Sequence, residues 1–509
     1  MFTRAARRQL IDAARRAELG AHGGGALGGV GGLNTAHLFA CSARSASGLF
    51  ASASGVAALP ATRQLCSAAA WRGFAGNSGV FAALRSNHAL QPRSSAPAAF
   101  TRRCSTAASA GPQAGGLFHH VLVTSPGAQR AVGAWLWGGA AWVFSLVVLG
   151  GVTRLTRSGL SMTDWKFTGE RAPRTAEDWE AEFAKYRSSP EFQHLNRGMT
   201  LDEFKFIFWM EYAHRMWGRT LGIYFAVPVA YFAARGYLTR KMGMRLAMLF
   251  AAGGTQGVVG WWMVRSGLEQ PRREHDIPRV SPYRLATHLS TAFAIYSGIL
   301  WTALDVSRPT PALADAALTG RQLLASLAAR RRFHGLAGLI GITAISGAFV
   351  AGLDAGHAYN TFPLMGGRIV PEEYWDAQFG SWWRNSFENT AAVQFHHRVL
   401  ALTTASGIAA AWAATQMGPP LPRAAALAVH ALGGAVVAQV TLGIATLLHN
   451  VPVWLGSAHQ AGALTLFSVA LTLLHALRAP AHVKQRAAAE AAALVRRSAP
   501  KAAGVPAQA

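Results

Sequence analysis

Four histidines occupy matching positions in two halves of the sequence, and their arrangement suits the axial ligation of haem iron. The four are His214, His288, His397 and His459. One constant offset along the sequence superimposes the first on the third, and a short correction for loop length brings the second onto the fourth. Two imidazoles from different helices of one bundle can bind an iron porphyrin from both sides. We therefore predict one haem site in each half, with these side chains as ligands.

Two simpler interpretations of these histidines remain. A lone histidine at the mouth of an apolar helix is more often an interfacial or capping residue, but four at related positions favour ligation. Zinc is the weaker metal alternative, because two imidazoles without a third cysteine or carboxylate fall short of its usual ligand set. A second candidate ligand, His396, directly precedes His397. The repeat register aligns Arg398 with Arg215 and so favours His397.

Arginines follow one histidine of each predicted pair, namely Arg215 and Arg398. A porphyrin carries two propionates, and a guanidinium can bind a carboxylate through two parallel hydrogen bonds. We predict that both arginines bind propionates. The alternative is that they are interfacial residues whose charged heads reach toward water.

One position differs between the halves in a way that matters chemically. The offset that relates His214 to His397 also aligns Glu211 with Gln394, and each lies three residues before its histidine, on the same helix face. A carboxylate beside a haem can take up and release protons, whereas an amide cannot titrate. The sequence therefore predicts a reactive N-terminal site and a passive C-terminal one. The alternative for Glu211 is a structural hydrogen bond, or an ion pair with Arg215 or Arg219.

Long apolar segments must position these residues. The chain of 509 residues is 51% hydrophobic and only 14% charged, which is unlike a soluble domain. Eight apolar runs are long enough to cross a bilayer as helices. They are 131–153, 206–232, 244–264, 285–304, 333–352, 392–415, 424–447 and 455–477. We predict an all-α integral membrane protein of eight transmembrane helices, built as two tandem four-helix bundles (130–305 and 333–478). An even number of spans per half makes this a parallel internal repeat.

Charged residues between the apolar runs predict the orientation. Segment 235–245 has four basic residues and no acid, whereas segment 353–391 has two arginines against five acids. This is the positive-inside pattern, and it places the N-terminus inside and all four histidines near the outer face. The formal charge of +25 therefore follows the membrane topology and does not indicate nucleic-acid binding.

Both ends of the chain differ from the apolar region. Residues 1–115 contain twelve arginines, no lysine and two acids, which is typical of a mitochondrial transit peptide; a natively disordered tail is the alternative. All three cysteines lie in this leader, so the remaining chain can form no disulfide and no thiolate-ligated metal site. We expect residues 479–509 to form a disordered basic tail.

Five stretches of the sequence resemble haem A synthase of the mitochondrial type, within the cytochrome c oxidase assembly proteins. They are GGVTRLTRSGLSMTDW (150–165), EFKFIFWMEYAHRMWGR (203–219), HDIPRVSPYRLATH (275–288), SGAFVAGLDAGHAYNTFP (346–363) and VQFHHR (393–398). The resemblance spans roughly 120–480. Some bacterial relatives carry a cysteine pair in an outward loop, and this sequence has none there.

The resemblance implies an oxidoreductase of the mitochondrial inner membrane that converts haem O to haem A for cytochrome c oxidase. The family's four axial histidines match His214, His288, His397 and His459, and its reactive glutamate matches Glu211. The family also implies haem O in the N-terminal half and haem b in the C-terminal half. Its implied partners are haem O synthase as the supplier of substrate, a ferredoxin-type electron donor, membrane lipid and a further copy of the chain.

Two other functions stay open at this point. A di-haem b-type electron carrier, such as a quinone oxidoreductase, would need the same histidines but no equivalent of Glu211. A transporter with a parallel repeat should show broken helices near mid-membrane and bind no pigment. Within the enzyme interpretation, the inserted oxygen could come from O₂ or from water, and binding of O₂ would require one axial histidine to leave.

Overall fold

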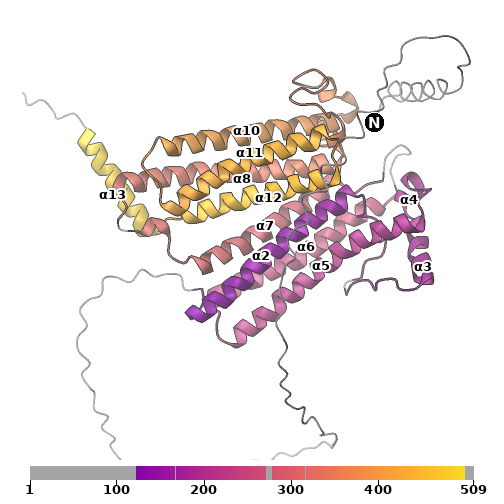
Figure 1. Cartoon of the computed structure of the whole chain (residues 1–509), viewed down its shortest axis with the longest axis horizontal. Coiled ribbons are helices and arrows are strands. Elements are labelled where there is room, and N and C mark those ends of the chain that lie inside the picture. The colour runs from indigo at the N-terminus through magenta and orange to yellow at the C-terminus, as the bar shows by residue number, and fades with distance from the viewer. Residues whose placement is uncertain (1–121, 167, 271–277, 316, 499–509) are drawn as a thin grey trace, which may run out of the picture. The chain divides into compact units, whose positions relative to one another are not determined.

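The computed structural model describes residues 122–498 except 167, 271–277 and 316, all within one compact unit, Ala107–Ala509. The described residues form helices, with two isolated β-bridges and no strand, which confirms the predicted all-α fold for this part of the chain. The predicted leader, 1–115, lies outside the described residues. The long helices are α2 (Pro126–Leu155), α5 (Leu201–Ala234), α6 (Arg240–Leu268), α7 (Pro282–Ser307), α8 (Gly320–Gly352), α10 (Thr390–Gln416), α11 (Arg423–Leu448) and α12 (Val453–Ala476) (Figure 1).

The long helices pack as two groups of four. In one group, α2 and α6 each contact both α5 and α7; in the other, α8 and α11 each contact both α10 and α12. The first group buries Val132, Leu136 and Leu304, and the second buries Phe333 and Leu432. The groups meet where α12 contacts α2 and α7, and where α7 contacts α8. Each predicted pair of histidines thus comes from one group.

Among the residues that the structure describes, five long segments are apolar enough to cross a membrane, so the chain is an all-helical membrane protein. They are Pro126–Leu155, Pro282–Ala314, Gly320–Gly352, Arg423–Leu448 and Val453–Ala476. The remaining long helices, α5, α6 and α10, are more polar. For example, α5 carries Glu211, Arg215 and Arg219 within three turns. Eight spans were expected. Five of them are long and apolar enough to cross a membrane, and the other three stay a prediction.

The start of α5 explains how its reactive residues are placed. Thr200 and Glu203 form a capping box, in which Glu203 N–H donates to Thr200 Oγ1 (3.3 Å) and Thr200 N–H donates to Glu203 Oε2 (2.8 Å). The helix therefore begins five residues before the predicted span, 206–232. Its first turns contact α3 (Ala176–Arg187), and His214 falls in about the fourth turn.

The C-terminal segment differs from the expected disordered tail. Residues Ala481–Ser498 form helix α13, which packs against α8. Val483 and Ala487 are buried in the core of the second helix group, and these apolar contacts explain why the segment is helical despite its basic composition. Residues 499–509 lie outside the described residues.

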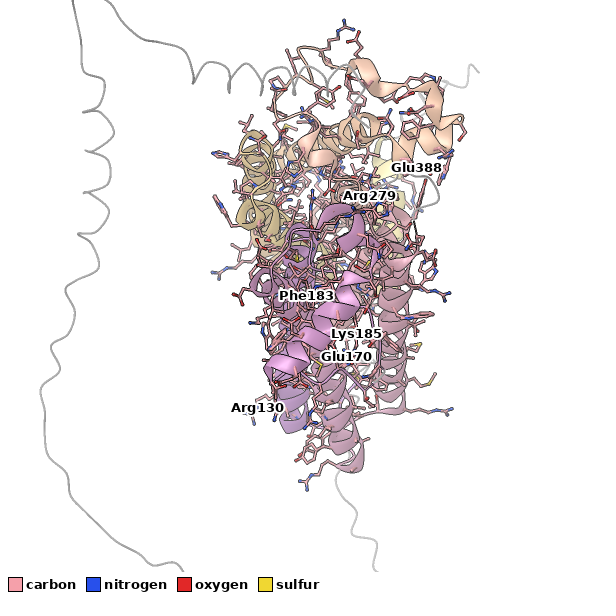
Figure 2. The ribbon with its side chains drawn as sticks, turned by 90° about the vertical axis from the view of Figure 1, so that its right-hand side faces the viewer. Arg130, Glu170, Phe183, Lys185, Arg279 and Glu388 are labelled. Atoms are coloured by element: carbon pink, nitrogen blue, oxygen red, sulfur yellow. The ribbon has the colours of Figure 1, made fainter. Side chains whose placement is uncertain are left out.

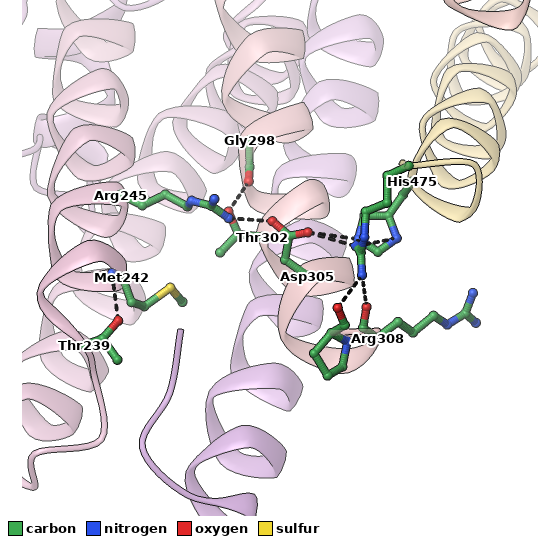
Figure 3. Close-up of polar contacts among 10 residues, drawn as sticks. Thr239, Met242, Arg245, Gly298, Thr302, Asp305, Arg308 and His475 are labelled. Carbon is green, nitrogen blue, oxygen red and sulfur yellow. Dashed lines mark hydrogen bonds and ion pairs between the residues drawn. The ribbon is translucent and has the colours of Figure 1, made fainter. Parts of the chain in front are cut away.

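A partly buried ionic cluster joins the two helix groups near the C-terminal ends of α7 and α12 (Figure 3). The Asp305 carboxylate accepts hydrogen bonds from Arg245 Nη1 (2.8 Å), His475 Nε2 (3.0 Å) and Arg478 Nη1 (2.9 Å). These partners come from α6, α12 and the residues just after α12, so one carboxylate connects three elements.

We expect Asp305→Ala to lower the free energy of unfolding by about 2 to 3 kcal/mol, because it leaves two guanidiniums without their carboxylate. That is less than for a fully buried pair, since the Asp305 side chain is 19% exposed. Thermal unfolding of the detergent-purified protein measures the change. Glu269→Ala is the matched control, because Glu269 forms an exposed pair with Arg265 and should cost under about 0.5 kcal/mol. Equal effects of both changes would contradict this prediction.

Candidate haem-binding sites

His397 of α10 and His459 of α12 lie together within the second helix group. Their ring centroids are 6.5 Å apart, and their planes are inclined by 84°. Metal–imidazole bonds are about 2 Å long, so rings on opposite sides of one metal ion have centres about 6 Å apart. The pair therefore fits the two axial positions of a haem. His396 lies elsewhere, with its Nε2 3.1 Å from the hydroxyl of Tyr374.

In the first helix group, His214 and His288 come from α5 and α7, which both pack against α2 and α6. Among the described residues, no three His, Cys, Asp or Glu side chains gather as a metal cluster. Each site thus offers two imidazoles, which suits a metal whose other ligands belong to a porphyrin.

Each of the four rings lies against a glycine of a neighbouring helix. The pairs, with the distance from an ideal Cβ on the glycine to the imidazole Cε1, are Gly150–His214 (3.0 Å), Gly260–His288 (3.0 Å), Gly347–His397 (3.3 Å) and Gly443–His459 (2.8 Å). A side chain at these positions would push against the ring, so glycine lets the imidazole approach the helix backbone. The offset that relates His214 to His397 also relates Gly260 to Gly443. The sequence analysis missed Gly150 and Gly347, which a second, slightly larger offset would have found.

Glutamines hold the second histidine of each pair in the same way. Gln256 Nε2 donates to the backbone oxygen of His288 (2.8 Å) and lies 3.2 Å from its Nδ1. Gln439 Nε2 donates to the backbone oxygen of His459 (3.0 Å) and lies 3.1 Å from its Nδ1. The match between Gln256 and Gln439 in the sequence thus corresponds to one shared arrangement.

Glu211 and Gln394 are both buried, and their surroundings differ as their chemistry does. The Glu211 carboxylate accepts hydrogen bonds from Ser161 Oγ (2.7 Å), Met162 N (2.8 Å) and Arg215 Nη2 (2.6 Å). Three donors suit a group that can only accept. These contacts also show that Glu211 anchors segment 158–162, which is the structural role considered as its alternative. The sequence analysis missed Ser161 and Met162, because no periodicity reveals the path of a loop.

The Gln394 amide meets acceptors instead. Its Nε2 donates to the backbone oxygens of Ala355 (2.9 Å) and Tyr359 (3.2 Å), and its Oε1 accepts from Arg398 (3.2 Å). A carboxylate here would face two carbonyl oxygens without a proton to give them. The loops over the two sites are therefore matched to a carboxylate in one half and to an amide in the other.

Arg215 and Arg398 attach these loops to their helices. Arg215 donates to the backbone oxygens of Asp164 (2.9 Å) and Met162 (2.9 Å), and Arg398 donates to that of Tyr359 (3.0 Å). Arg215 also lines a cavity of about 260 Å³ together with Trp165, Trp261 and Arg265 (remaining lining residues: Thr163, Asp164, Val264 and Leu268). Two guanidiniums at one cavity could receive an anionic group, so the propionate role of Arg215 stays a prediction.

A second buried carboxylate lies in the segment between α2 and α5. Glu191, at the start of α4 (Pro190–Leu195), is 6% exposed and accepts a hydrogen bond from the Tyr186 hydroxyl (3.1 Å). Phe183 and Lys185 come from α3 (Figure 2). Phe183 packs on the same apolar cluster as Tyr186, and Lys185 forms an ion pair with Asp164 (2.9 Å). Burial raises the pKa of Glu191 to about 7; the charge of Glu211 adds to this, whereas Tyr186, Arg154 and Arg157 oppose it.

We expect Glu191→Gln to stabilise the protein above pH 7. Because the folded-state pKa exceeds the usual value of 4.5, the contribution of Glu191 is full below pH 4.5 and is lost as the pH rises through 7. The free energy of unfolding of the unaltered protein should therefore fall by roughly 2 to 3 kcal/mol between these pH values. The variant should not show this decrease. Melting temperatures of both proteins from pH 5 to 8 measure the effect, and parallel curves would contradict it.

Comparison with known proteins shows which family the chain belongs to. Residues 133–471 match the COX15-CtaA family, described as a cytochrome oxidase assembly protein. "Heme A synthase COX15" of Arabidopsis thaliana is 54% identical over 75% of this chain and 82% of its own length. The protein of the same name from Homo sapiens is 48% identical over 70% and 85%, and "Heme A synthase" of Nitrosospira multiformis is 44% identical over 69% and 94%. With most of both chains aligned at such identity, this protein belongs to the COX15-CtaA family of cytochrome oxidase assembly proteins.

Proposed function

We propose that this protein is a haem A synthase, an oxidoreductase that converts one methyl group of haem O into the formyl group of haem A. The observation that carries the proposal is a difference between one carboxylate and one amide in two closely similar sites. Both sites have a pair of histidines, a glycine against each imidazole ring and a glutamine that hydrogen-bonds one histidine. Glu211 lies in one site and Gln394 in the other. An electron carrier with two equivalent haems gives no reason for that difference.

The histidines divide between substrate and resident haem in this proposal. His214 and His288 hold haem O beside Glu211, and His397 and His459 hold haem b beside the uncharged Gln394. When bound, haem iron supplies the redox chemistry and the route for electrons. Oxidation of a methyl to a formyl group removes four electrons and releases protons. Glu211 is the catalytic residue that accepts protons at its carboxylate, while Arg215 and Ser161 hold that carboxylate in position.

The membrane arrangement follows from the same pairing. We propose that all eight long helices span the inner mitochondrial membrane as a parallel tandem repeat, with halves 130–305 and 333–478. Exposed apolar side chains on the helices outside the five candidate spans support this, among them Ile223 and Val227 on α5 and Met248 on α6. The basic connection 235–245 supports a matrix-side N-terminus, with both haem sites toward the intermembrane space.

The proposed partners follow from the reaction. Haem O is apolar and membrane-bound, so a haem O synthase in the same membrane is its proposed supplier. If the inserted oxygen comes from O₂, each hydroxylation also consumes two electrons from a donor, for which we propose a ferredoxin-type protein. A homo-oligomer is compatible with the exposed apolar side chains of α5 and α6.

Pigment analysis tests the proposed function. The protein is purified from cells that make haem O, and the extracted porphyrins are identified by chromatography. We expect haem b together with haem A or a hydroxylated precursor. Haem b alone would indicate the di-haem electron carrier, and a colourless protein would indicate the transporter.

A further inference from the structure

The first histidines of the two pairs, His214 and His397, differ in what their Nδ1 atoms contact. His397 Nδ1 lies 2.7 Å from Ser346 Oγ, and Ser346 donates its own proton to the backbone oxygen of Thr343 (2.7 Å). The hydroxyl must therefore accept from the Nδ1–H group of His397. This bond leaves Nε2 without a proton, which is the form of imidazole that binds a metal.

His214 has no such support. Its Nδ1 is buried and has no hydrogen-bond partner. The local packing is otherwise equivalent, because Gly150 lies under the His214 ring as Gly347 lies under the His397 ring. The residue before each glycine differs: Ser346 precedes Gly347, and Leu149 precedes Gly150. The leucine side chain can neither donate nor accept a hydrogen bond, so it leaves His214 unsupported.

The second histidines do not share this difference. His288 and His459 have the same glutamine contacts at nearly the same distances. Among the four histidines, the difference in Nδ1 contacts is thus confined to the first of each pair. A metal-bound imidazole usually donates its other N–H, and loss of that partner typically lowers metal affinity by about 10- to 100-fold.

We propose that His214 is the labile axial ligand of the N-terminal site and that Leu149 makes it so. The inference rests on the proposed haem ligation, and it selects His214 over His288. An imidazole that leaves readily would free one axial position beside Glu211 and would let a haem enter or leave this half. In the C-terminal half, Ser346 keeps His397 bound and makes that haem a permanent resident. Leu149 and Ser346 are thus positioning residues that act through the histidines.

Carbon monoxide binding to the reduced, pigment-loaded protein tests this proposal, because the ligand needs a free axial position. We expect the unaltered protein to bind carbon monoxide at the N-terminal haem only. Leu149→Ser should lower that affinity about 10-fold or more, since it adds the missing acceptor. Leu149→Ala is the matched control: it removes the same bulk without adding a hydroxyl, and it should retain the binding.

The reciprocal change, Ser346→Ala, should make the C-terminal haem b accessible to carbon monoxide. Equal binding at both haems of the unaltered protein, or the same affinity in Leu149→Ser and Leu149→Ala, would overturn the proposal. Absorption spectra keep this failure distinct from failure of the proposed function. Two haems with bis-imidazole spectra but no carbon monoxide selectivity reject the role of Leu149 alone, whereas absence of haem rejects the ligation itself.

Discussion

Replacement of Glu211 by glutamine is expected to stop the formation of haem A while the protein keeps its pigment. The amide is nearly the same size as the carboxylate but cannot take up protons from the methyl group under oxidation. A positioned acid–base group typically contributes about 10²- to 10⁴-fold to a rate, so we expect product formation to fall at least about 100-fold. Chromatography of the extracted porphyrins measures haem A, and the total haem per protein measures the filling of both sites.

The structural role of Glu211 requires a control, because its carboxylate also anchors segment 158–162. Ser161→Ala removes one of the three donors, at 2.7 Å, and leaves the carboxylate in place. If proton transfer is the main role, Ser161→Ala should keep most of the product formation that Glu211→Gln loses. Equal losses in both variants would show that Glu211 acts by holding the loop. Full turnover by Glu211→Gln would remove it from the mechanism.

The pairing of the histidines could be predicted because matching residues in the two halves of the sequence recur at a constant offset that can be counted. The offset between His214 and His397 also relates Gln256 to Gln439. In the structure, these two glutamines make the same contacts with His288 and His459. Long apolar runs likewise predict helices, since a chain in a membrane must satisfy its own backbone hydrogen bonds. These signals are local or strictly periodic, and both kinds can be found in a single chain.

Contacts between helices that are distant in sequence could not be predicted in this way. Ser346 meets His397 because α8 packs beside α10, and nothing near either residue indicates which face of α8 will be turned inward. Two of the three donors of Glu211, Ser161 and Met162, come from a loop whose course is set by Arg215 and by the aromatic cluster around Phe204. Helix α13 shows the opposite error: its composition suggested disorder, but two small apolar side chains, Val483 and Ala487, dock it on the core.

Replacement of Gly443 by alanine is expected to remove most of the haem from the C-terminal half. The new Cβ would lie 2.8 Å from Cε1 of His459, closer than carbon atoms normally approach, so the ring must move. Displacement of an axial ligand should lower haem b content by about 10-fold or more, in line with the effect of mispositioned metal ligands. The backbone should tolerate the change, because alanine favours a helix over glycine by about 1 kcal/mol. The haem b to protein ratio measures the result.

Gly434 provides the matched control on the same helix, since a Cβ there meets no heavy atom within 4 Å. Gly434→Ala should keep its haem b and melt at the same or a slightly higher temperature.

The equivalent change in the other half, Gly260→Ala, places a Cβ 3.0 Å from Cε1 of His288, and it should deplete haem O and haem A while sparing haem b. Loss of the same pigment from both Gly443→Ala and Gly260→Ala would contradict the assignment of two different haems to the two halves. Unchanged haem b content in Gly443→Ala would show that the His459 ring does not bind haem from its present position, because the new methyl group would displace the ring from there.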